Sequence, residues 1–460
     1  MKGLRLAITA VAILLCLLAA LPQRLAAQTS SNTAFYVEVA KPEQNRIYVF
    51  NDPKAYQEFL ATGDIEKKIT RIGDGPNGET MIFDSENAIH LYNFKHDRPA
   101  EIIIKTEPPA VPMQEKLPYK FSGYTFDDYF YNVQSNDNQD LIPNRVINGP
   151  QDFNGFIMQR TYFTFDDQIS DKFSARFRLE ADQASFNTDL KISVFVKDAW
   201  LRWKDLYKNG DLWFGIQPTP AYEVEEQLWA YRSLQKTIMD LRGIVPSRDF
   251  GASLRGKFNS DGKNNYWFMV GNNSGNRVEL DKFKRFYFQY WLNLTKLTIT
   301  AYYDYRQNPD FIIQPPNPGV PPQLLGANVN TGAIFVGYGV KDKYEVGVSS
   351  FISDQSNGFI PVVGTPHDKK SIGTSIWGWA NFSDAKYGLV GRYDFFDPNT
   401  DNQVKNDYRN YWLFSFVYRP IKNIWIMPNV QGEQYQNLPG TLQLKSAWQP
   451  RITFYWIYLS

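Results

Sequence analysis

The chain has 460 residues, of which 16% are aromatic and only 21% are charged. This balance excludes a disordered chain, because half-buried strands are rich in Phe and Tyr whereas disordered segments are rich in charge. The 49 basic and 48 acidic residues leave a formal charge of +1, so no strong field indicates a nucleic acid as partner.

Residues 1–27 have the layout of a secretory signal peptide. A basic start is followed by an apolar run from Leu6 to Leu21 and by two alanines before Gln28. A membrane anchor is the alternative, but the run is shorter than the roughly 20 residues of a spanning helix. Cys16 is the only cysteine, so cleavage would leave a mature chain without disulfides or thiol chemistry.

Residues 28–105 are expected to form a small α+β domain in the periplasm. A short helix is predicted at 52–63, with Pro53 near its start and Gly63 at its end. Strands are predicted by apolar runs at 34–40, 46–50, 79–83 and 100–105. Residues 106–118 contain four prolines and predict an extended linker. The domain would contact a periplasmic partner or the cell wall, or partly plug a pore formed by the rest of the chain, and its residues do not select among these roles.

From Tyr119 onward the sequence alternates with period two, which is typical of strands. Sixteen strands are predicted, at 119–133, 156–166, 172–183, 191–204, 210–217, 248–259, 263–272, 283–294, 296–307, 331–341, 343–353, 372–383, 386–396, 409–419, 422–434 and 446–459.

The connections between these strands alternate between short and long. Short turns such as "DQISD", "NSDGK" and "RPIK" would all fall at one end of the sheet, and long loops such as 218–247 and 308–330 at the other. Outer-membrane barrels sort their connections in this way, whereas soluble β-sandwiches do not. The sequence therefore predicts an all-β fold, a 16-stranded antiparallel transmembrane β-barrel in the outer membrane.

Side-chain alternation supports a barrel wall with one apolar and one polar face. In "KFSARFRLEAD" the residues Phe173, Phe177 and Leu179 alternate with Arg176, Arg178 and Glu180. A soluble antiparallel sheet would alternate in the same way. The chain has too few helices to cover such a sheet, however, and Tyr and Trp gather near strand ends, as in membrane girdles. A charge on the lipid face costs roughly 2 to 4 kcal/mol, so the charged face must line the lumen.

The third long loop contains "YEVEEQLWAYRSLQKTIMDLRG", residues 222–243, which has helical periodicity. We expect one amphipathic helix that folds into the lumen and places a charged stripe in the constriction. That stripe consists of Glu225, Arg232, Lys236 and Asp240. The alternative is a helix that caps the outer mouth, with its charges in solvent.

The barrel half resembles bacterial outer-membrane porins of the phosphate-selective type. The resemblance covers "SGYTFDDYFYNV" (122–133), "RTYFTFDDQISDKFSARFRLEAD" (160–182) and 212–258, which begins "LWFGIQPTPAYEVEEQLWAYRS". It implies a sixteen-strand, often trimeric, passive channel, with Arg176, Arg178, Arg202 and Arg255 lining the pore. Acidic residues stand between the basic ones, so phosphate selectivity is not carried over. The remaining predicted wall residues are Glu180, Asp249, Asp304 and Arg306.

No catalytic or metal-binding pattern is present in the sequence. Of the three histidines, only His367 falls in the barrel, in a long loop, so a Ser-His pair inside the barrel has no histidine to use. We therefore expect no enzyme, no cofactor and no metal. The predicted function is passive diffusion of small hydrophilic solutes and ions through a homotrimer embedded in outer-membrane lipid. The alternative is a plugged barrel that serves in surface binding or as a scaffold.

Overall fold

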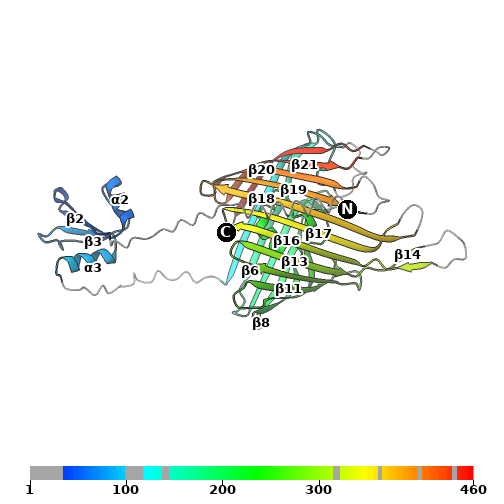
Figure 1. Ribbon diagram of the computed structural model, residues 1–460, viewed down its shortest axis with the longest axis horizontal. Coiled ribbons are helices and arrows are strands. Elements are labelled where there is room, and N and C mark those ends of the chain that lie inside the picture. The colour runs from blue at the N-terminus through cyan, green and yellow to red at the C-terminus, as the bar shows by residue number, and fades with distance from the viewer. Residues whose placement is uncertain are drawn as a thin grey trace. The chain divides into compact units, whose positions relative to one another are not determined.

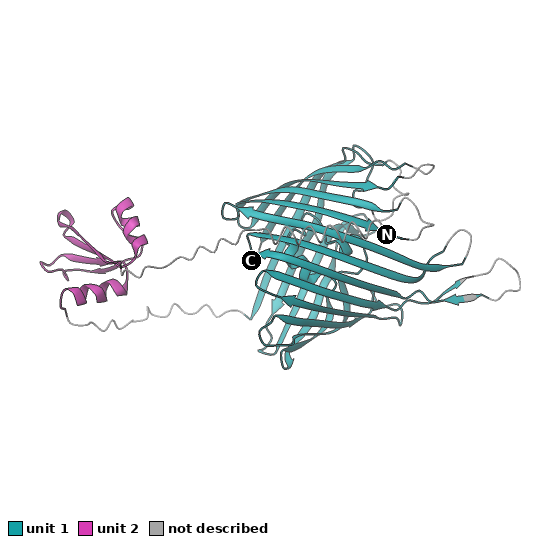
Figure 2. Ribbon diagram, in the orientation of Figure 1, with its two compact units in different colours: residues 1–12, 117–460 teal, residues 13–116 magenta. Residues whose placement is uncertain are grey.

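The structure of the chain is a computed structural model, and it describes residues 35–98, 118–136, 145–313, 322–360, 365–400, 407–437 and 443–458. The chain divides into two compact units, residues 13–116 and residues 1–12 with 117–460 (Figure 2). The expected signal peptide, the strand at 100–105 and nearly all of the linker at 106–118 lie outside the described residues.

The first unit is a four-stranded sheet with a helix on each face. The strands are β1 (Val37–Lys41), β2 (Arg46–Phe50), β3 (Ile69–Arg71) and β4 (Thr80–Phe83), in the order β1-β2-β4-β3. A short 3-10 helix, η1 (Pro42–Gln44), connects β1 and β2. The predicted strands at 34–40, 46–50 and 79–83 correspond to β1, β2 and β4, whereas β3 was not predicted.

Its two helices are fixed by local capping. Helix α2 (Pro53–Thr62) begins where the Asp52 side chain accepts a hydrogen bond from Lys54 N, and it ends at Gly63, whose φ of 80° favours glycine. Helix α3 (Glu86–Lys95), which was not predicted, is capped by Ser85. Alternate residues of β2 and β4 pack toward α2 and toward α3, so each face of the sheet has its own apolar core.

The second unit is a closed antiparallel barrel of sixteen strands (Figure 1). The sixteen strands predicted between 119 and 459 are confirmed, with ends shifted by a few residues. They are β5 (Tyr119–Tyr131), β6 (Asn154–Asp167), β7 (Phe173–Phe186), β8 (Ile192–Tyr207), β9 (Gly210–Pro218), β10 (Arg248–Lys257), β11 (Asn264–Gly271), β12 (Arg285–Asn293), β13 (Leu297–Arg306), β16 (Val329–Val340), β17 (Tyr344–Phe359), β18 (His367–Phe382), β19 (Tyr387–Asp397), β20 (Arg409–Ile421), β21 (Ile424–Tyr435) and β22 (Ala447–Tyr458).

The barrel closes because β22 pairs with β5, from Arg451 opposite Phe130 to Tyr458 opposite Gly123. The loop between β13 and β16 carries an additional hairpin, β14 (Phe311–Ile313) with β15 (Gln323–Leu325), which was not predicted. It extends from the end of the barrel where the long loops gather (Figure 1).

The two faces of the barrel strands differ as the alternation predicts. On β12 the apolar Phe286 and Phe288 are exposed, whereas Arg285, Tyr287 and Gln289 are buried. Since the barrel is closed, the exposed apolar face is its outer surface and the buried polar face lines the interior. Among the described residues, no helix has the length and hydropathy needed to cross a membrane.

The prediction of one long helix over 222–243 is wrong. The segment forms two short helices, α4 (Glu223–Trp229) and α5 (Ile238–Leu241), joined by a turn. Helix α4 ends at Ala230, whose φ is 56°, and the Trp229 indole N–H donates to the Gln235 carbonyl at 2.8 Å across the turn. The packing of Trp229, Tyr231 and Leu234 on the barrel wall overrides the helical spacing of the sequence.

Candidate functional site: a narrowed lumen

The loop 219–247 lies against the inner face of β16–β21. Trp229, Tyr231 and Leu234 of the loop share one buried cluster with inward side chains of these strands. The strand members of that cluster are Phe335, Trp377, Trp379, Val390, Tyr411, Leu413, Val417 and Met427. A second cluster joins Tyr222, Ile238 and Met239 to inward residues of β11–β13, β17 and β19. The apolar side of the loop therefore covers this half of the inner wall.

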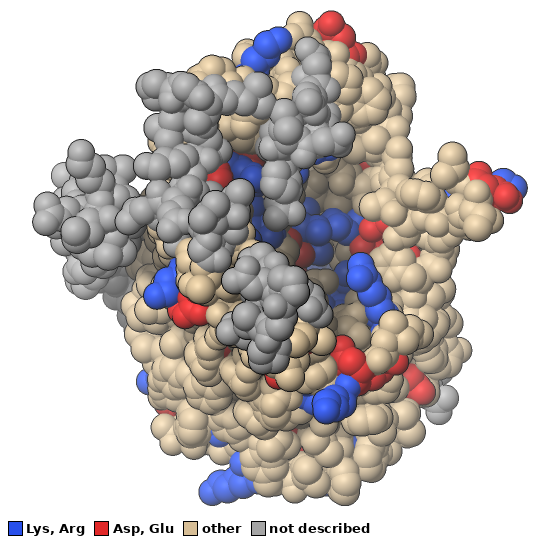
Figure 3. All heavy atoms as spheres, turned by 90° about the vertical axis from the view of Figure 1, so that its right-hand side faces the viewer, with Lys and Arg blue, Asp and Glu red and all other residues tan. Residues whose placement is uncertain are grey.

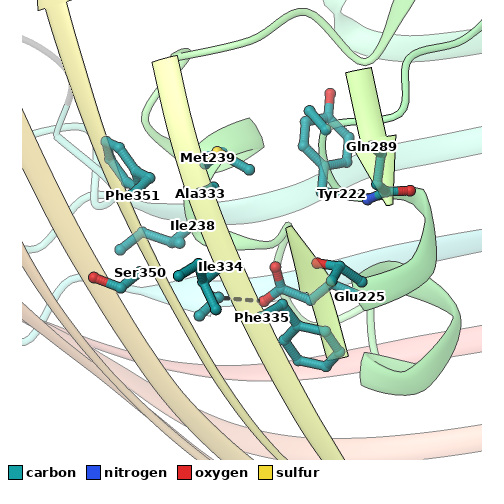
Figure 4. A pocket seen from close by; sticks show the side chains of 13 residues that line it. Tyr222, Glu225, Ile238, Met239, Gln289, Ala333, Ile334, Phe335, Ser350 and Phe351 are labelled. Carbon is teal, nitrogen blue, oxygen red and sulfur yellow. Dashed lines mark hydrogen bonds between the residues drawn. The ribbon is translucent and has the colours of Figure 1, made fainter. Parts of the chain in front are cut away.

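Glu225 belongs to this covered side of the loop. Its carboxylate accepts hydrogen bonds from Ser349 Oγ at 2.9 Å and from Trp377 Nε1 at 3.2 Å. Figure 4 shows Glu225 near Phe335, with its bond to the wall dashed. Glu225 is 3% exposed. The structure thus places it against the wall, away from the other three residues of the predicted charged stripe.

Those three residues lie together on the opposite side of the loop. Arg232 Nη1 contacts Asp240 Oδ2 at 2.7 Å and also binds Glu226. Lys236 Nζ lies 3.5 Å from Asp240 Oδ1. This charged side faces the inner wall formed by β5–β10, and a cavity of about 190 Å³ separates the two. The cavity is lined by Tyr124, Tyr162, Arg178, Lys197, Glu223, Glu226, Gln227, Arg232 and Arg248.

The wall across the cavity is a network of ion pairs. Glu180 binds Arg160 and Lys197, each at 2.8 Å. Asp198 is fully buried and binds Arg178 at 3.3 Å and also Arg248. Among the described residues, this part of the wall carries four basic and two acidic side chains in these pairs. The facing side of the loop carries two basic residues and three acidic ones, Glu223, Glu226 and Asp240.

A second cavity lies on the short-turn side of the loop. It measures about 1180 Å³ and shares Gln227 with the first cavity. Its far lining consists of the turns between β12 and β13, β16 and β17, β18 and β19, and β20 and β21. Gln227 is exposed at the junction of the two cavities. Gln227 therefore lines both the cavity between the loop and the β5–β10 wall and the larger cavity at the short-turn end.

At the other end, the long-loop face of the barrel is hollowed and has Lys and Arg side chains inside the hollow (Figure 3). Nearby on the inner wall, Asp304 binds Arg285 at 2.8 Å, and Arg306 follows two residues along the same face. Asp249 accepts hydrogen bonds from Tyr287 Oη at 2.7 Å and from two backbone N–H groups of the loop after β11. These three predicted wall residues are all on inward-facing positions.

The remaining predicted wall residues lie nearer the short turns. Arg176 binds Asp166 and Arg202 binds Asp211, each at 2.6 Å. Arg255 stacks between two indoles, with its guanidinium carbon 4.0 Å from the Trp213 ring centre and 3.6 Å from that of Trp267. Within the described part of the chain, Arg255 has no carboxylate partner, and it donates to Gln217 Oε1 at 2.7 Å.

Sequence analysis missed Lys197, Arg160 and Arg248 on the wall and Glu223 and Glu226 on the loop. Lys197 was missed because of a β-bulge: Arg178 pairs with Asp198, but Leu179 pairs with Val196, so Lys197 and Asp198 both turn inward. Strict alternation would have sent Lys197 into lipid. Because a lysine charge in lipid is costly, a lysine at an outward position of the predicted strand could have indicated a bulge.

Among the described residues, no group of three or more His, Cys, Asp or Glu side chains could hold a metal ion.

Comparisons with known proteins identify the fold. No protein-family model and no curated protein matches the sequence. The outer membrane channel DcaP of Acinetobacter baumannii is similar in structure, with a TM-score of 0.51 at 12% identity, over 74% of this chain and 97% of that one. An anion-selective porin from Comamonas acidovorans matches with a TM-score of 0.50 at 10% identity, over 74% of this chain and 99% of that one. At these identities the similarity extends to the fold.

Proposed function

We propose that this chain is an outer-membrane porin that lets small hydrophilic solutes and ions diffuse passively across the membrane. One observation carries the proposal: the interior keeps a charge-lined cavity between the loop 219–247 and the β5–β10 wall, and a larger cavity at the short-turn end that shares Gln227 with it. A barrel that served only as a scaffold would have no use for charge-lined interior space of this kind. The fold shared with an outer-membrane channel and a porin supports the same function.

The charges around the narrow cavity create an electric field across it, and this field can select among the solutes that pass. Basic side chains are in excess on the wall, and acidic ones are in slight excess on the loop. A dipolar solute that passes between them is oriented, because fixed charges act strongly where water is scarce. The small basic excess supports a preference for anions over cations.

The residues proposed to form the constriction are Arg232, Lys236 and Asp240, as the sequence suggested, with Glu223 and Glu226 in place of Glu225. The replacement follows from the hydrogen bonds of Glu225 to the covered wall. The proposed lumen wall consists of Arg176, Arg178, Glu180, Arg202, Asp249, Arg255, Asp304 and Arg306, joined by Arg160, Lys197, Asp198 and Arg248.

The protein is proposed to act without catalysis and as a homotrimer. His367 is the only histidine of the barrel sequence, so a histidine-assisted nucleophile inside the lumen has no base.

We also propose that residues 28–105 form a periplasmic domain tethered by 106–118, which contacts a periplasmic or cell-wall partner. This is supported by β5, whose first residue lies at the short-turn end, the periplasmic end in barrels of this kind.

Conductance in planar lipid bilayers tests the proposed function. The purified full-length chain should give sustained, stepwise currents, and liposomes that contain it should swell in small neutral sugars. Currents in a salt gradient should reverse at a potential that indicates anion preference. Correctly folded protein that gives neither current nor swelling would instead be a plugged barrel, which is the scaffold alternative.

A further inference from the structure

The outer face of β5 carries a carboxylate. Asp127 pairs directly with Phe454 of β22 and with Met158 of β6. Phe454 is 43% exposed on the outer surface of the barrel. Residues that lie opposite each other in an antiparallel pair point to the same face. The next residue, Asp128, is turned inward, where Arg451 binds it at 3.1 Å. Asp127 therefore faces outward.

The depth of Asp127 in the membrane follows from its neighbours on β22. The outward residues of that strand begin with Trp448 near the long loops and end with Tyr458 near the short turns. Outward aromatic residues at strand ends mark the two membrane interfaces. Phe454, which lies opposite Asp127, is between Trp448 and Tyr458. The Asp127 carboxylate consequently stands at the level of the hydrocarbon region.

At that level the carboxylate lacks a donor. Among the described residues, Asp127 Oδ1 is buried and has no hydrogen-bond partner. The outward carboxylate of Asp354 on β17 differs, because Lys370 lies 3.6 Å from it. Hydrocarbon chains offer no donor, so a carboxylate left among them costs free energy. A donor that satisfies Asp127 has to come from another molecule.

The residues beside Asp127 form a row of small side chains across β5, β6 and β7. Thr125 pairs with Thr161, and Thr161 pairs with Ala181. Small and hydroxyl side chains are typical of contacts between membrane-spanning segments, because they let two backbones approach closely. The outward positions of β12 and β13 carry mostly large side chains instead: Phe286, Phe288, Tyr290, Leu292, Leu297, Ile299, Ala301, Tyr303 and Tyr305.

We propose that the outer face of β5–β7 around Asp127 is the surface on which a second copy of this chain docks within the membrane. The proposal rests on the homotrimer of the proposed function and names the face through which it forms. The second copy would supply an N–H or O–H donor to Asp127 and fill the row of small side chains. Lipid chains can fill that row but carry no donor, whereas a protein surface does both. A closed ring of three copies uses head-to-tail contacts, so the donor comes from a different face of the next copy.

Substitutions of Asp127 test the contact. Asp127→Leu removes the acceptor, Asp127→Asn keeps an acceptor oxygen without the charge, and Ala301→Leu on the outer face of β13 is the control. The measurement is the temperature at which the oligomer dissociates in SDS. We expect dissociation at a lower temperature for Asp127→Leu, at an intermediate one for Asp127→Asn and at the original one for Ala301→Leu. If Asp127 faced lipid, Asp127→Leu would remove a charge from the hydrocarbon, and an oligomer as stable as the unchanged one would overturn the proposal.

Site-specific photo-crosslinking in intact cells tests the same face without weakening it. A photoreactive side chain at Thr161 should give a covalent dimer of the full chain, and one at Ala301 should give none. The proposal is overturned if Thr161 yields no dimer or if both sites yield it equally. Conductance of the same preparations separates this proposal from the proposed function. A conducting protein without the Thr161 dimer overturns the interface alone, and a cross-linked protein that does not conduct supports the interface and overturns the proposed function.

Discussion

The inner faces of the two halves of the barrel differ sharply, although both are built from alternating strands. The β5–β10 wall presents ion pairs such as Arg160 with Glu180 to a cavity, whereas the β11–β21 wall packs aromatic and aliphatic side chains against the loop and keeps its ion pairs, such as Arg285 with Asp304, buried. The loop 219–247 separates them, because its apolar side covers one wall and its charged side faces the other. An inward-folded loop thus determines which half of a wide barrel is core and which half is channel.

The energetics of the two halves also differ. Each large apolar side chain that the loop buries contributes about 1.5 to 3 kcal/mol, an upper estimate since the unfolded chain is partly compact. The ion pairs opposite contribute little net stability, because desolvation offsets much of their attraction. We therefore expect apolar contacts to hold the loop in place and charges to set what passes beside it.

The largest effect is expected from Trp229→Ala, which removes the central side chain of the loop's apolar side. Trp229 is fully buried, and truncation of such a side chain costs about 3 to 5 kcal/mol. The loop should detach while the barrel persists, so single-channel conductance should rise and fluctuate, and proteolysis within 219–247 should accelerate. Trp203→Ala on the outer surface, where Trp203 is 41% exposed, is the control and should change neither readout. Unaltered conductance in Trp229→Ala would show that the loop does not narrow the pore.

A smaller effect is expected from Lys236→Glu on the charged side of the loop. Arg232 still neutralises Asp240 in this variant, so the fold should hold while the loop becomes more negative. A change of about 1 kcal/mol in the barrier for an ion corresponds to a roughly fivefold change in permeability. The reversal potential in a salt gradient should therefore shift to a value that indicates a roughly fivefold higher permeability for cations relative to anions. Lys172→Glu, in an exposed short turn, should leave it unchanged. Equal shifts of the reversal potential in both variants would show that a charge on the loop has no more influence on ion preference than a charge in a short turn.

The smallest effect is expected from Glu225→Gln, because the amide oxygen can still accept from Ser349 and Trp377. Stability should change by less than about 1 kcal/mol, and ion preference should stay the same. Glu226→Gln, one residue along, removes a charge from the narrow cavity and should increase anion preference. The comparison fails if Glu225→Gln alters the reversal potential as much as Glu226→Gln does.

The sequence predicted the barrel well because strands, turns and girdles are local patterns. Alternation such as Phe286, Phe288 and Tyr290 against Arg285 and Tyr287 depends only on period two and on the cost of charge in lipid. The inward positions of all eight predicted wall residues follow from the same pattern.

The site was less predictable because it depends on contacts between distant segments. Helical spacing in 222–243 is also satisfied by two short helices, and the left-handed Ala230 that separates them is fixed by packing of Trp229 and Tyr231 on the wall. Within α4, the orientation of the helix against the wall turns Glu225 toward Ser349 and leaves Glu226 at the cavity. Lys197 depends on a bulge, which period two cannot reveal.

The most direct test of the account is single-cysteine accessibility at Gln227 and Glu225, in a Cys16→Ser background that has no other cysteine. Gln227 lies at the junction of the two cavities, and Glu225 is buried against the covered wall two residues away. A charged, membrane-impermeant thiol reagent should reduce the current of open Gln227→Cys channels in discrete steps and leave Glu225→Cys channels unchanged. Steps in Glu225→Cys, together with an unresponsive Gln227→Cys, would place the water route on the other side of the loop and contradict the account.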